Sequence, residues 1–416
     1  MVRFIHCSDL HLDTPFKGLS RIDPDLAAKQ RKATSESFER IVGLCIEREV
    51  DFLIIAGDVY DSANRSVSTQ IKFAKQLGRL NDIGMPVYLV CGNHDPLSEW
   101  LDAAKLPPNV HRFSSKEIER VTFEREGERV ADIYGTSFEQ KVVEENLAAK
   151  YELPADRAPV NIAVLHGTVG SPGSHAVYAQ FSVDDVAAKG FDYWALGHIH
   201  KRHNVREAHP AIVYPGNPQG RDFGETGAKG CVLVEIEPGK SPSIEFIQTQ
   251  TIRFEDVEID ITGGDDLNRL DSLIEDAAEQ VDGHDSDCGY VYRITLRGRT
   301  SLHHHLSDTE EIDGLVEQLN EGGGTDIIDR IEIRTVPDLD LDAIRAGNDF
   351  PATVLRLADS YGTDEERLKG LFDAVDEDFK SAAAKRLMGD LPEDRMAGIL
   401  NEAAMDLLTK LVEDAE

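Results

Sequence analysis

Five short apolar runs in the first 200 residues each end in residues whose side chains can bind a metal ion. In an open α/β sheet, ligands bind beyond the carboxyl ends of the strands, so we expect these ends to converge on one site. A single Asp-x-His pair would carry little weight, but coincidence does not explain five such ends in order. They are Ser8-Asp9-Leu10-His11, Gly57-Asp58-Val59-Tyr60-Asp61, Gly92-Asn93-His94-Asp95, His166-Gly167 and Gly197-His198-Ile199-His200.

The residue types indicate the chemistry of that site. Oxygen and imidazole ligands without thiolates suit Mn, Fe or Zn. The set is larger than one ion needs, so we predict two ions bridged by a carboxylate, with Asp58 as the natural bridge. Two ions roughly 3.5–4 Å apart clamp both oxygens of an in-line displacement, which makes phosphate esters the predicted substrates. The candidate ligands are among the Asp, Asn and His side chains of these five strand ends.

Other histidines are predicted to lie outside the site. The run His303-His304-His305 looks like a metal tract, but it follows a strand in a different region, so we predict an exposed turn there. His6 alternates within a predicted strand and is expected in the core.

The elements that must position the site alternate between strands and helices up to residue 250. Apolar residues at helical spacing predict helices over 33–49 and 67–83, and 139–158 is interpreted as a helical excursion with loops. Seven short runs, rich in β-branched or aromatic residues and bounded by Gly, Asp, Asn or Pro, are typical of buried strands. These runs are 4–7, 52–56, 87–91, 162–165, 193–196, 211–214 and 231–234.

The pattern changes after residue 250. The order β-α-β-α-β predicts a small α+β unit over 251–336, followed by an acidic connector at 337–349. The pattern of residues 350–413 is helical. We therefore predict an α/β domain, a small α+β cap domain and a helical C-terminal region, at 1–250, 251–340 and 341–416.

The net charge excludes one class of protein. The 416 residues include 44 Lys and Arg against 77 Asp and Glu, a net charge of −33. Residues 1–250 hold 28 basic and 35 acidic side chains, whereas residues 251–416 hold 16 and 42. A simple basic nucleic-acid binder is therefore excluded. A salt-adapted surface and an acidic surface for a basic partner both remain, and we favour the first because the excess is spread along the chain.

Composition also bears on compartment and redox state. With 41% hydrophobic residues the chain can form real cores, and no apolar run approaches the ~18 residues of a membrane span. The N-terminus lacks the pattern of a signal peptide, so we expect a soluble, cytoplasmic protein. Five scattered cysteines without a Cys-x-x-Cys motif predict buried thiols rather than disulfides or a zinc ribbon.

The ordered strand ends resemble those of the calcineurin-like metallophosphoesterase superfamily. The resemblance implies a β-sandwich flanked by helices, in α/β/β/α layers, over roughly residues 1–250. One ion would then be held by Asp9, His11, Asp58 and His200. The other would be held by Asp58, Asn93, His166 and His198.

The same resemblance implies two catalytic residues. His94 would meet the scissile phosphate or protonate the leaving oxygen. Asp61 would orient His94 through a carboxylate–imidazole hydrogen bond.

Within the superfamily the chain resembles DNA repair exonucleases of the SbcD and YhaO type, and the YhaO branch most. The supporting stretches are residues 7–19 and 214–221; Asp13 departs from the Gly that is usual in SbcD proteins. The resemblance implies a Mn-dependent exonuclease that degrades DNA ends from 3′ to 5′ with two divalent ions. Lys17 and Arg221 are candidate contacts to the DNA backbone.

Partners and competing functions follow from the same resemblance. Family members work with an SMC-like ATPase (SbcC-like) that grips the helical tail, and residues 350–413 fit that purpose nearly as well as they fit an ordinary packed subdomain. A second copy of the chain, forming a homodimer, is a further candidate partner.

The second candidate function, as an alternative to the exonuclease, is a small-molecule phosphodiesterase or phosphatase. A non-catalytic scaffold ranks last, because such scaffolds lose ligands that this chain keeps.

Overall fold

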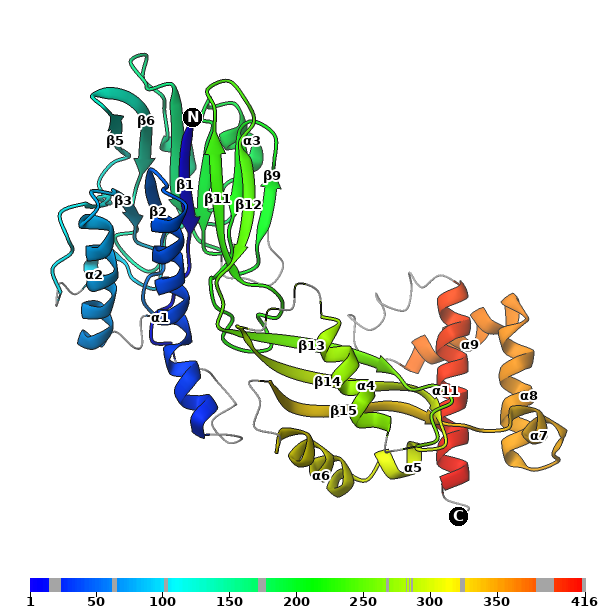
Figure 1. Cartoon of the computed structure of the whole chain (residues 1–416). Coiled ribbons are helices and arrows are strands. Elements are labelled where there is room, and N and C mark those ends of the chain that lie inside the picture. Colours follow the sequence, from blue (N-terminus) through cyan, green and yellow to red (C-terminus); the bar gives the residue numbers. More distant parts are fainter. Residues whose placement is uncertain are drawn as a thin grey trace. The chain divides into compact units, whose positions relative to one another are not determined.

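The structure is a computed structural model of the chain, and its elements are labelled in Figure 1. It divides into two compact units, which we describe separately. The first unit comprises Met1–Asp256, Val281–Tyr292 and Gly323–Asp329, and the second comprises Val257–Gln280, Arg293–Gly322 and Arg330–Glu416. The structure describes all residues except 15–23, 62–65, 101–103, 171–176, 267–268, 282, 284, 286, 322–325, 379–392 and 414–416.

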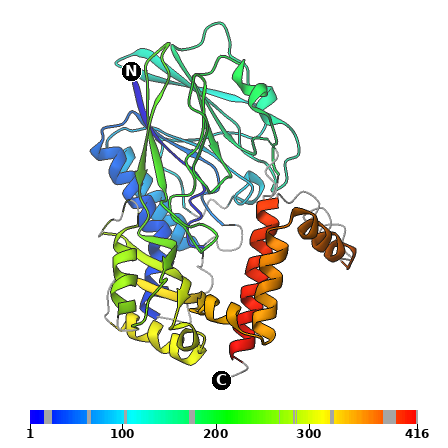
Figure 2. The same cartoon turned by 90° about the vertical axis from the view of Figure 1, so that its right-hand side faces the viewer.

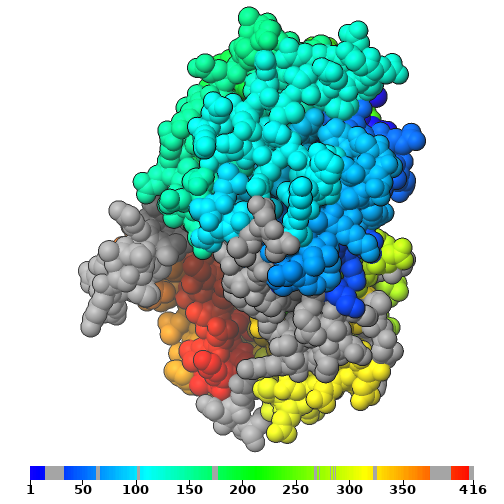
Figure 3. All heavy atoms as spheres, turned by 90° about the vertical axis from the view of Figure 1, so that its left-hand side faces the viewer, coloured from blue at the N-terminus to red at the C-terminus, as the bar shows by residue number. Residues whose placement is uncertain are grey.

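The first unit contains a six-stranded sheet in the order β12-β11-β1-β2-β3-β4. Neighbours from β1 to β4 pair in parallel, and β11 pairs antiparallel with both β1 and β12. Two helices, α1 (Pro24–Glu47) and α2 (Val67–Asn81), cover one face with side chains such as Phe38 and Phe73. The strands are β1 (Val2–Cys7), β2 (Phe52–Ala56), β3 (Val87–Val90), β4 (Val110–Arg112), β11 (Gly230–Ile236) and β12 (Ser243–Gln248). In the space-filling view, the part of the chain that includes α2 (blue) lies at the surface of this unit (Figure 3).

A second six-stranded sheet has the order β5-β6-β7-β8-β10-β9. Its inner strands are parallel, and β5 and β9 pair antiparallel at the two edges. The short helix α3 (Val183–Ala187) contributes to the apolar cluster on its outer face. The strands are β5 (Glu119–Arg125), β6 (Glu128–Gly135), β7 (Val160–His166), β8 (Tyr193–Gly197), β9 (His203–Arg206) and β10 (Ala211–Tyr214).

The two sheets share one apolar core. Phe4 stacks on Phe52 within the first sheet at a ring-centroid distance of 5.1 Å, and it meets Tyr193 of the second sheet edge-on at 5.4 Å. Residues on the other face of each sheet pack against helices or loops, so the strands are buried on both faces, as their continuous apolar sequences require. The predicted β-sandwich flanked by helices is confirmed.

A third sheet, β13-β14-β15, begins in the first unit and ends in the second. Its strands are β13 (Ile252–Asp260), β14 (Gly289–Thr300) and β15 (Ile327–Pro337). Figure 2 gives a second view of the helices of this unit. They are α4 (Leu270–Glu279), α5 (His303–Leu306), α6 (Thr309–Asn320), α7 (Leu341–Ala346), α8 (Phe350–Gly362), α9 (Glu365–Asp378) and α11 (Glu393–Glu413). This is the predicted small α+β unit followed by helices; the exact domain boundaries stay a prediction.

In three segments the structure adds detail to the prediction. Residues 139–158 hold one 3-10 turn, Leu147–Lys150, rather than a longer helix, because their apolar side chains pack individually: the buried Tyr151 donates its hydroxyl to Val164 O at 2.6 Å. The acidic connector contains α7, whose N-cap Asp340 accepts from Ala343 N. The histidine run forms the single helical turn α5, in which His304 and His305 are exposed and His303 Nδ1 lies 2.8 Å from Thr335 Oγ1.

Two other predictions hold. All five cysteines are buried free thiols. His6 is fully buried, with Nδ1 3.0 Å from the Tyr193 hydroxyl. Within the described part of the chain, no helix is both long and apolar enough to span a membrane.

Candidate metal centre

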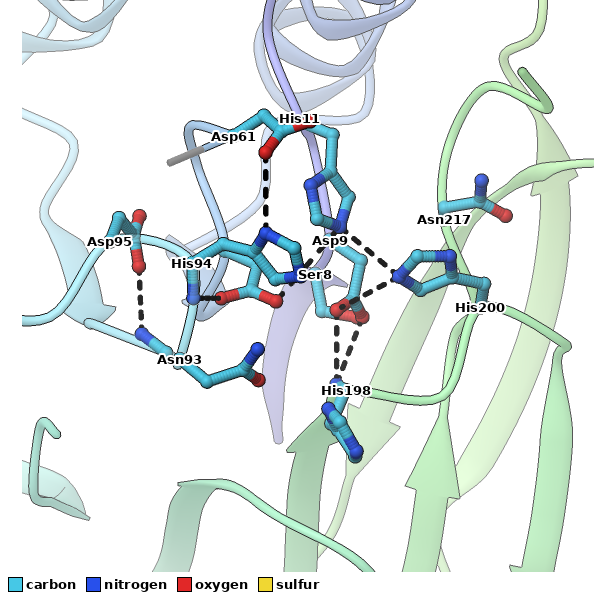
Figure 4. Close-up of polar contacts among 12 residues, drawn as sticks. Ser8, Asp9, His11, Asp61, Asn93, His94, Asp95, His198, His200 and Asn217 are labelled. Carbon is cyan, nitrogen blue, oxygen red and sulfur yellow. Dashed lines mark hydrogen bonds and ion pairs between the residues drawn. The ribbon is translucent and has the colours of Figure 1, made fainter. Parts of the chain in front are cut away.

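The carboxyl ends of five strands supply the predicted site. Strands β1, β2 and β3 come from the first sheet, and β7 and β8 from the second, so the site lies where both sheets end. Backbone hydrogen bonds join the loops that follow β1 and β2: Asp9 N donates to Gly57 O at 3.0 Å, and His11 N donates to Asp58 O at 3.1 Å. Figure 4 shows several of the converging side chains.

The backbone of this site is strained. Asp9, His11, Asp58 and His198 have positive φ angles of 53°, 42°, 52° and 104°. Such conformations cost non-glycine residues of order 1–3 kcal/mol each and gather where function needs them. They turn the chain sharply after β1, β2 and β8 and aim the side chains at one another.

One cluster consists of Asp9, His11 and His200, whose candidate ligand atoms all lie within 4.8 Å of one another. His11 Nε2 is 3.1 Å from His200 Nε2, and His200 Nε2 is 3.8 Å from Asp9 Oδ1. Two ring nitrogens that face each other beside a carboxylate form a donor set that fits a divalent transition-metal ion.

A second cluster consists of Asp58, His166 and His198, again within 4.8 Å. His166 Nε2 is 3.4 Å from Asp58 Oδ2 and 3.0 Å from Asn93 Oδ1. Asp58 Oδ2 also lies 3.9 Å from His11 Nε2 of the first cluster. One carboxylate oxygen therefore reaches both clusters, and the structure brings all seven candidate ligands together. Their assignment to metal ions stays a prediction.

The surroundings of His166 fix which ring nitrogen faces the cluster. Its Nδ1 donates to Ala56 O at 2.9 Å, which leaves Nε2 directed at Asp58 and Asn93. A Cβ on Gly92 would collide with Asp58 Oδ1 and with the His166 ring, so only glycine fits at this position. The loop after β3 can approach the cluster this closely because it lacks a side chain there.

The protonation states of two candidate ligands suit metal binding. Burial, followed by the charges of His200 and Arg221, holds the pKa of His11 well below its usual value, so its ring is neutral. For Asp58, burial opposes ionisation, but the charge of and the hydrogen bond to His166 hold its pKa well below the usual range. Neutral imidazole and ionised carboxylate are the forms that coordinate metals. For His166, burial lowers the pKa but Asp58 more than offsets this and raises it to about 9, so its ring must lose a proton to bind an ion.

His94 stands beside the clusters. Its backbone N donates to Asp58 Oδ1 at 2.8 Å, and its ring Nδ1 lies 3.3 Å from Asp61 Oδ1. Its side chain is 37% exposed, so it can meet a substrate. Burial lowers the pKa of His94, but Asp61 and Asp58 more than offset this and raise it above the usual value. The ring is therefore a potential proton donor.

Sequence reasoning assigned no role to two carboxylates that organise the site. Asp95 is fully buried and accepts hydrogen bonds from Val59 N at 2.7 Å and Gly92 N at 2.8 Å, so it joins the loops after β2 and β3. Its position in Gly92-Asn93-His94-Asp95 could have signalled this role. Glu225 accepts from His200 Nδ1 at 2.6 Å, and no sequence signal pointed to it.

The geometry does not test the two predicted substrate contacts, Lys17 and Arg221. Lys17 lies outside the described residues. The Arg221 guanidinium pairs with Glu225, with its Nη2 2.6 Å from Glu225 Oε1. A role of either residue in substrate binding stays a prediction.

Comparisons with known proteins agree with this site. The family model described as calcineurin-like phosphoesterase matches residues 2–202, and that of the YhaO metallophosphoesterase middle domain matches residues 254–336. The sandwich and its Asp and His clusters are thus those of a metallophosphoesterase, a class that hydrolyses phosphoesters.

Relatives narrow the family. The metallophosphoesterase YhaO of Bacillus subtilis is 41% identical over 278 residues, which is 67% of this chain and 68% of that protein. The DNA double-strand break repair protein Mre11 of Methanopyrus kandleri is 27% identical over 61% of this chain and 58% of its own length. One component of the nuclease SbcCD of Bacillus subtilis is 23% identical over 58% of this chain and 67% of its own length. The chain belongs to the YhaO family of metallophosphoesterases.

Proposed function

We propose that the protein is a Mn²⁺-dependent exonuclease that hydrolyses phosphodiester bonds at DNA ends, from 3′ to 5′, with two divalent ions. The observation that carries the proposal is the position of Asp58 Oδ2, 3.4 Å from His166 Nε2 and 3.9 Å from His11 Nε2. A shared carboxylate between two donor sets is what a two-ion phosphoesterase needs. The choice of DNA is supported by the relatives, one of which is named as a DNA double-strand break repair protein and another as part of a nuclease.

The chain's own residues divide the work. In our proposal one ion is held by Asp9, His11, Asp58 and His200, and the other by Asp58, Asn93, His166 and His198. Bound there, the ions would lower the pKa of a water molecule and neutralise charge on the phosphate. His94 donates its Nε2 proton to the leaving 3′ or 5′ oxygen, and Asp61 holds Nδ1 so that Nε2 faces the substrate.

The proposal includes partners for the second unit. Large apolar side chains are exposed on its helices, among them Phe350 (62%) and Leu357 (53%) of α8 and Ile399 (37%) and Leu407 (41%) of α11. Exposed apolar positions on helices suit docking of a coiled coil, which would come from an SMC-like ATPase. We propose this partner, a homodimer of the chain and a cytoplasmic location as parts of the same function.

One experiment separates DNA from other phosphodiesters. The full chain is incubated with Mn²⁺ and end-labelled single- or double-stranded DNA, and in parallel with bis-p-nitrophenyl phosphate. Shortening of DNA from its 3′ end is expected, and chelation with EDTA should abolish it. Cleavage of the nitrophenyl ester alone would favour the second candidate, a small-molecule phosphodiesterase. The net charge of −33 favours this second candidate, because it repels DNA.

A further inference from the structure

Glu225 is a nearly buried carboxylate whose two oxygens are fully engaged. Its side chain is 11% exposed. Oε1 lies 2.6 Å from His200 Nδ1 and 2.6 Å from Arg221 Nη2. Oε2 accepts from Asn217 Nδ2 at 2.8 Å, from Arg221 Nε at 3.1 Å and from Arg221 N at 3.0 Å. Asn217 lies beside His200 in Figure 4.

This carboxylate selects the tautomer of His200. Because Oε1 can only accept, the proton of a neutral His200 ring must sit on Nδ1, and Nε2 then presents its lone pair toward Asp9 and His11. Arg221 Nη2 also lies 3.0 Å from His200 Nδ1, but that nitrogen cannot accept while it donates to Glu225. The contact to the charged carboxylate is the shorter of the two, so Glu225 sets the His200 tautomer. Arg221 acts on His200 through Glu225.

Three of the clustered histidines are oriented differently. His166 donates Nδ1 to a backbone carbonyl, that of Ala56. His11 Nδ1 is buried and has no hydrogen-bond partner among the described residues. His200 alone of these three is held by a carboxylate, and a carboxylate raises the basicity of a ligating imidazole more than a carbonyl does. The positive charge of Arg221 balances that of Glu225, so the pair adds no net negative charge that would repel a phosphate.

We propose that Glu225 is a positioning residue, held by Arg221 and Asn217, which sets the His200 tautomer and thereby the metal affinity of the Asp9–His11–His200 cluster but not that of the Asp58–His166–His198 cluster. The inference rests on the proposed function, because it requires that the clusters bind ions. Loss of such a carboxylate partner typically lowers metal affinity 10–100-fold.

The test is a calorimetric titration of the metal-free full chain with Mn²⁺. The wild type should bind two ions. Glu225→Leu removes the acceptor and should weaken one binding event by about 10–100-fold while the other is unchanged. Glu225→Gln keeps an oxygen acceptor for His200 Nδ1 and should restore much of the lost affinity at that one site, whereas a merely structural role predicts that both binding events change together. Circular dichroism is compared first, because the leucine variant could misfold. In that case the glutamine variant carries the test: it should weaken the same single binding event by less than about 10-fold, and two unchanged affinities in it would overturn the inference.

Glu119→Gln is the matched control, because Glu119 Oε2 also lies 3.0 Å from a histidine nitrogen, Nε2 of His111, outside both clusters. It should leave both affinities unchanged. Two unchanged affinities in folded Glu225→Leu would overturn the inference while leaving the proposed function intact, and so would equal weakening of both ions. A wild-type chain that binds fewer than two ions would instead overturn the proposed function.

Discussion

The two units place their charges in opposite ways. In the first unit, Asp9, His11, Asp58, Asp95 and His166 are buried together at the strand ends. Among the described residues of the second unit, the buried polar side chains are Thr300 and Thr335, and none that is ionisable is buried. Yet this second unit holds 35 acidic side chains in 141 residues, against 42 in the 275 residues of the first unit.

The comparison shows that the number of charged residues in a unit does not indicate where a functional site lies. Burying an ionised group is costly unless it is paired or coordinates a metal, so a buried cluster marks a site. An exposed carboxylate costs almost nothing and mainly affects solubility and repulsion. Loss of a single buried side chain should therefore impair metal binding and catalysis in the first unit. The stability of the second unit should depend mainly on salt concentration.

The largest effect is expected for Asp58→Ala, because this carboxylate reaches both clusters. Metal analysis of Mn²⁺-loaded protein should find that both ions are lost. Phosphodiester cleavage should fall by at least ~10⁴-fold, since the ions contribute several kcal/mol to the transition state. Loss of one ion only would remove the bridging role. Asp313→Asn in the second unit is the control and should leave metal content unchanged.

A smaller loss is expected for His94→Gln. If His94 protonates the leaving oxygen, its loss should slow DNA cleavage by about 10²–10⁴-fold while both ions remain bound. Asp61→Asn should retain the metals and show a weaker loss, because Asp61 acts through His94. Hydrolysis of bis-p-nitrophenyl phosphate should suffer less, since its leaving group needs no proton. If His94→Gln empties a metal site instead, His94 is a ligand, and the proton donor lies elsewhere.

The site was predictable because its signals are local. Each candidate ligand follows an apolar run, and parallel strands bring their carboxyl ends together whatever the details of the fold. Glu225 could not be found this way, since it precedes β11 in a loop and reaches His200 only through tertiary folding. Asp95 lies in the predicted strand end Gly92-Asn93-His94-Asp95, but its hydrogen bonds to Val59 and Gly92 form only when the chain folds.

The fold was predictable where strands are buried on both faces. The missed strands β4, β5, β6, β9 and β12 are half-exposed in whole or in part, so their sequences mix charged and apolar residues. Glu126 and Gly127 join β5 to β6 and both have positive φ angles, as the central residues of a tight hairpin turn require. The helical excursion predicted within 139–158 is only one 3-10 turn, because tertiary packing of Tyr151 outweighs local periodicity.

Salt should act mainly on the second unit. Raising KCl from about 0.1 to about 2 M screens repulsion among its exposed carboxylates, and relief of about 1–2 kcal/mol would raise the thermal midpoint of the second unit, followed in the full chain, by about 5 °C. Hydrogen exchange under both conditions should show added protection in α8 and α11 and little change in β1 and β7. A flat or falling midpoint would favour the alternative, an acidic surface that meets a basic partner.

The smallest effect is expected for Asp313→Asn in α6. Asp313 and Glu317 are both exposed and stand four residues apart on one helix face, where like charges destabilise by about 0.2–0.5 kcal/mol. The substitution should raise the free energy of unfolding by that amount at about 0.1 M KCl and have no effect at about 2 M KCl, as measured by urea unfolding. A benefit that persists at high salt would come from helix propensity or capping rather than repulsion. In that case screening of like charges on α6 would not account for the salt response of the second unit.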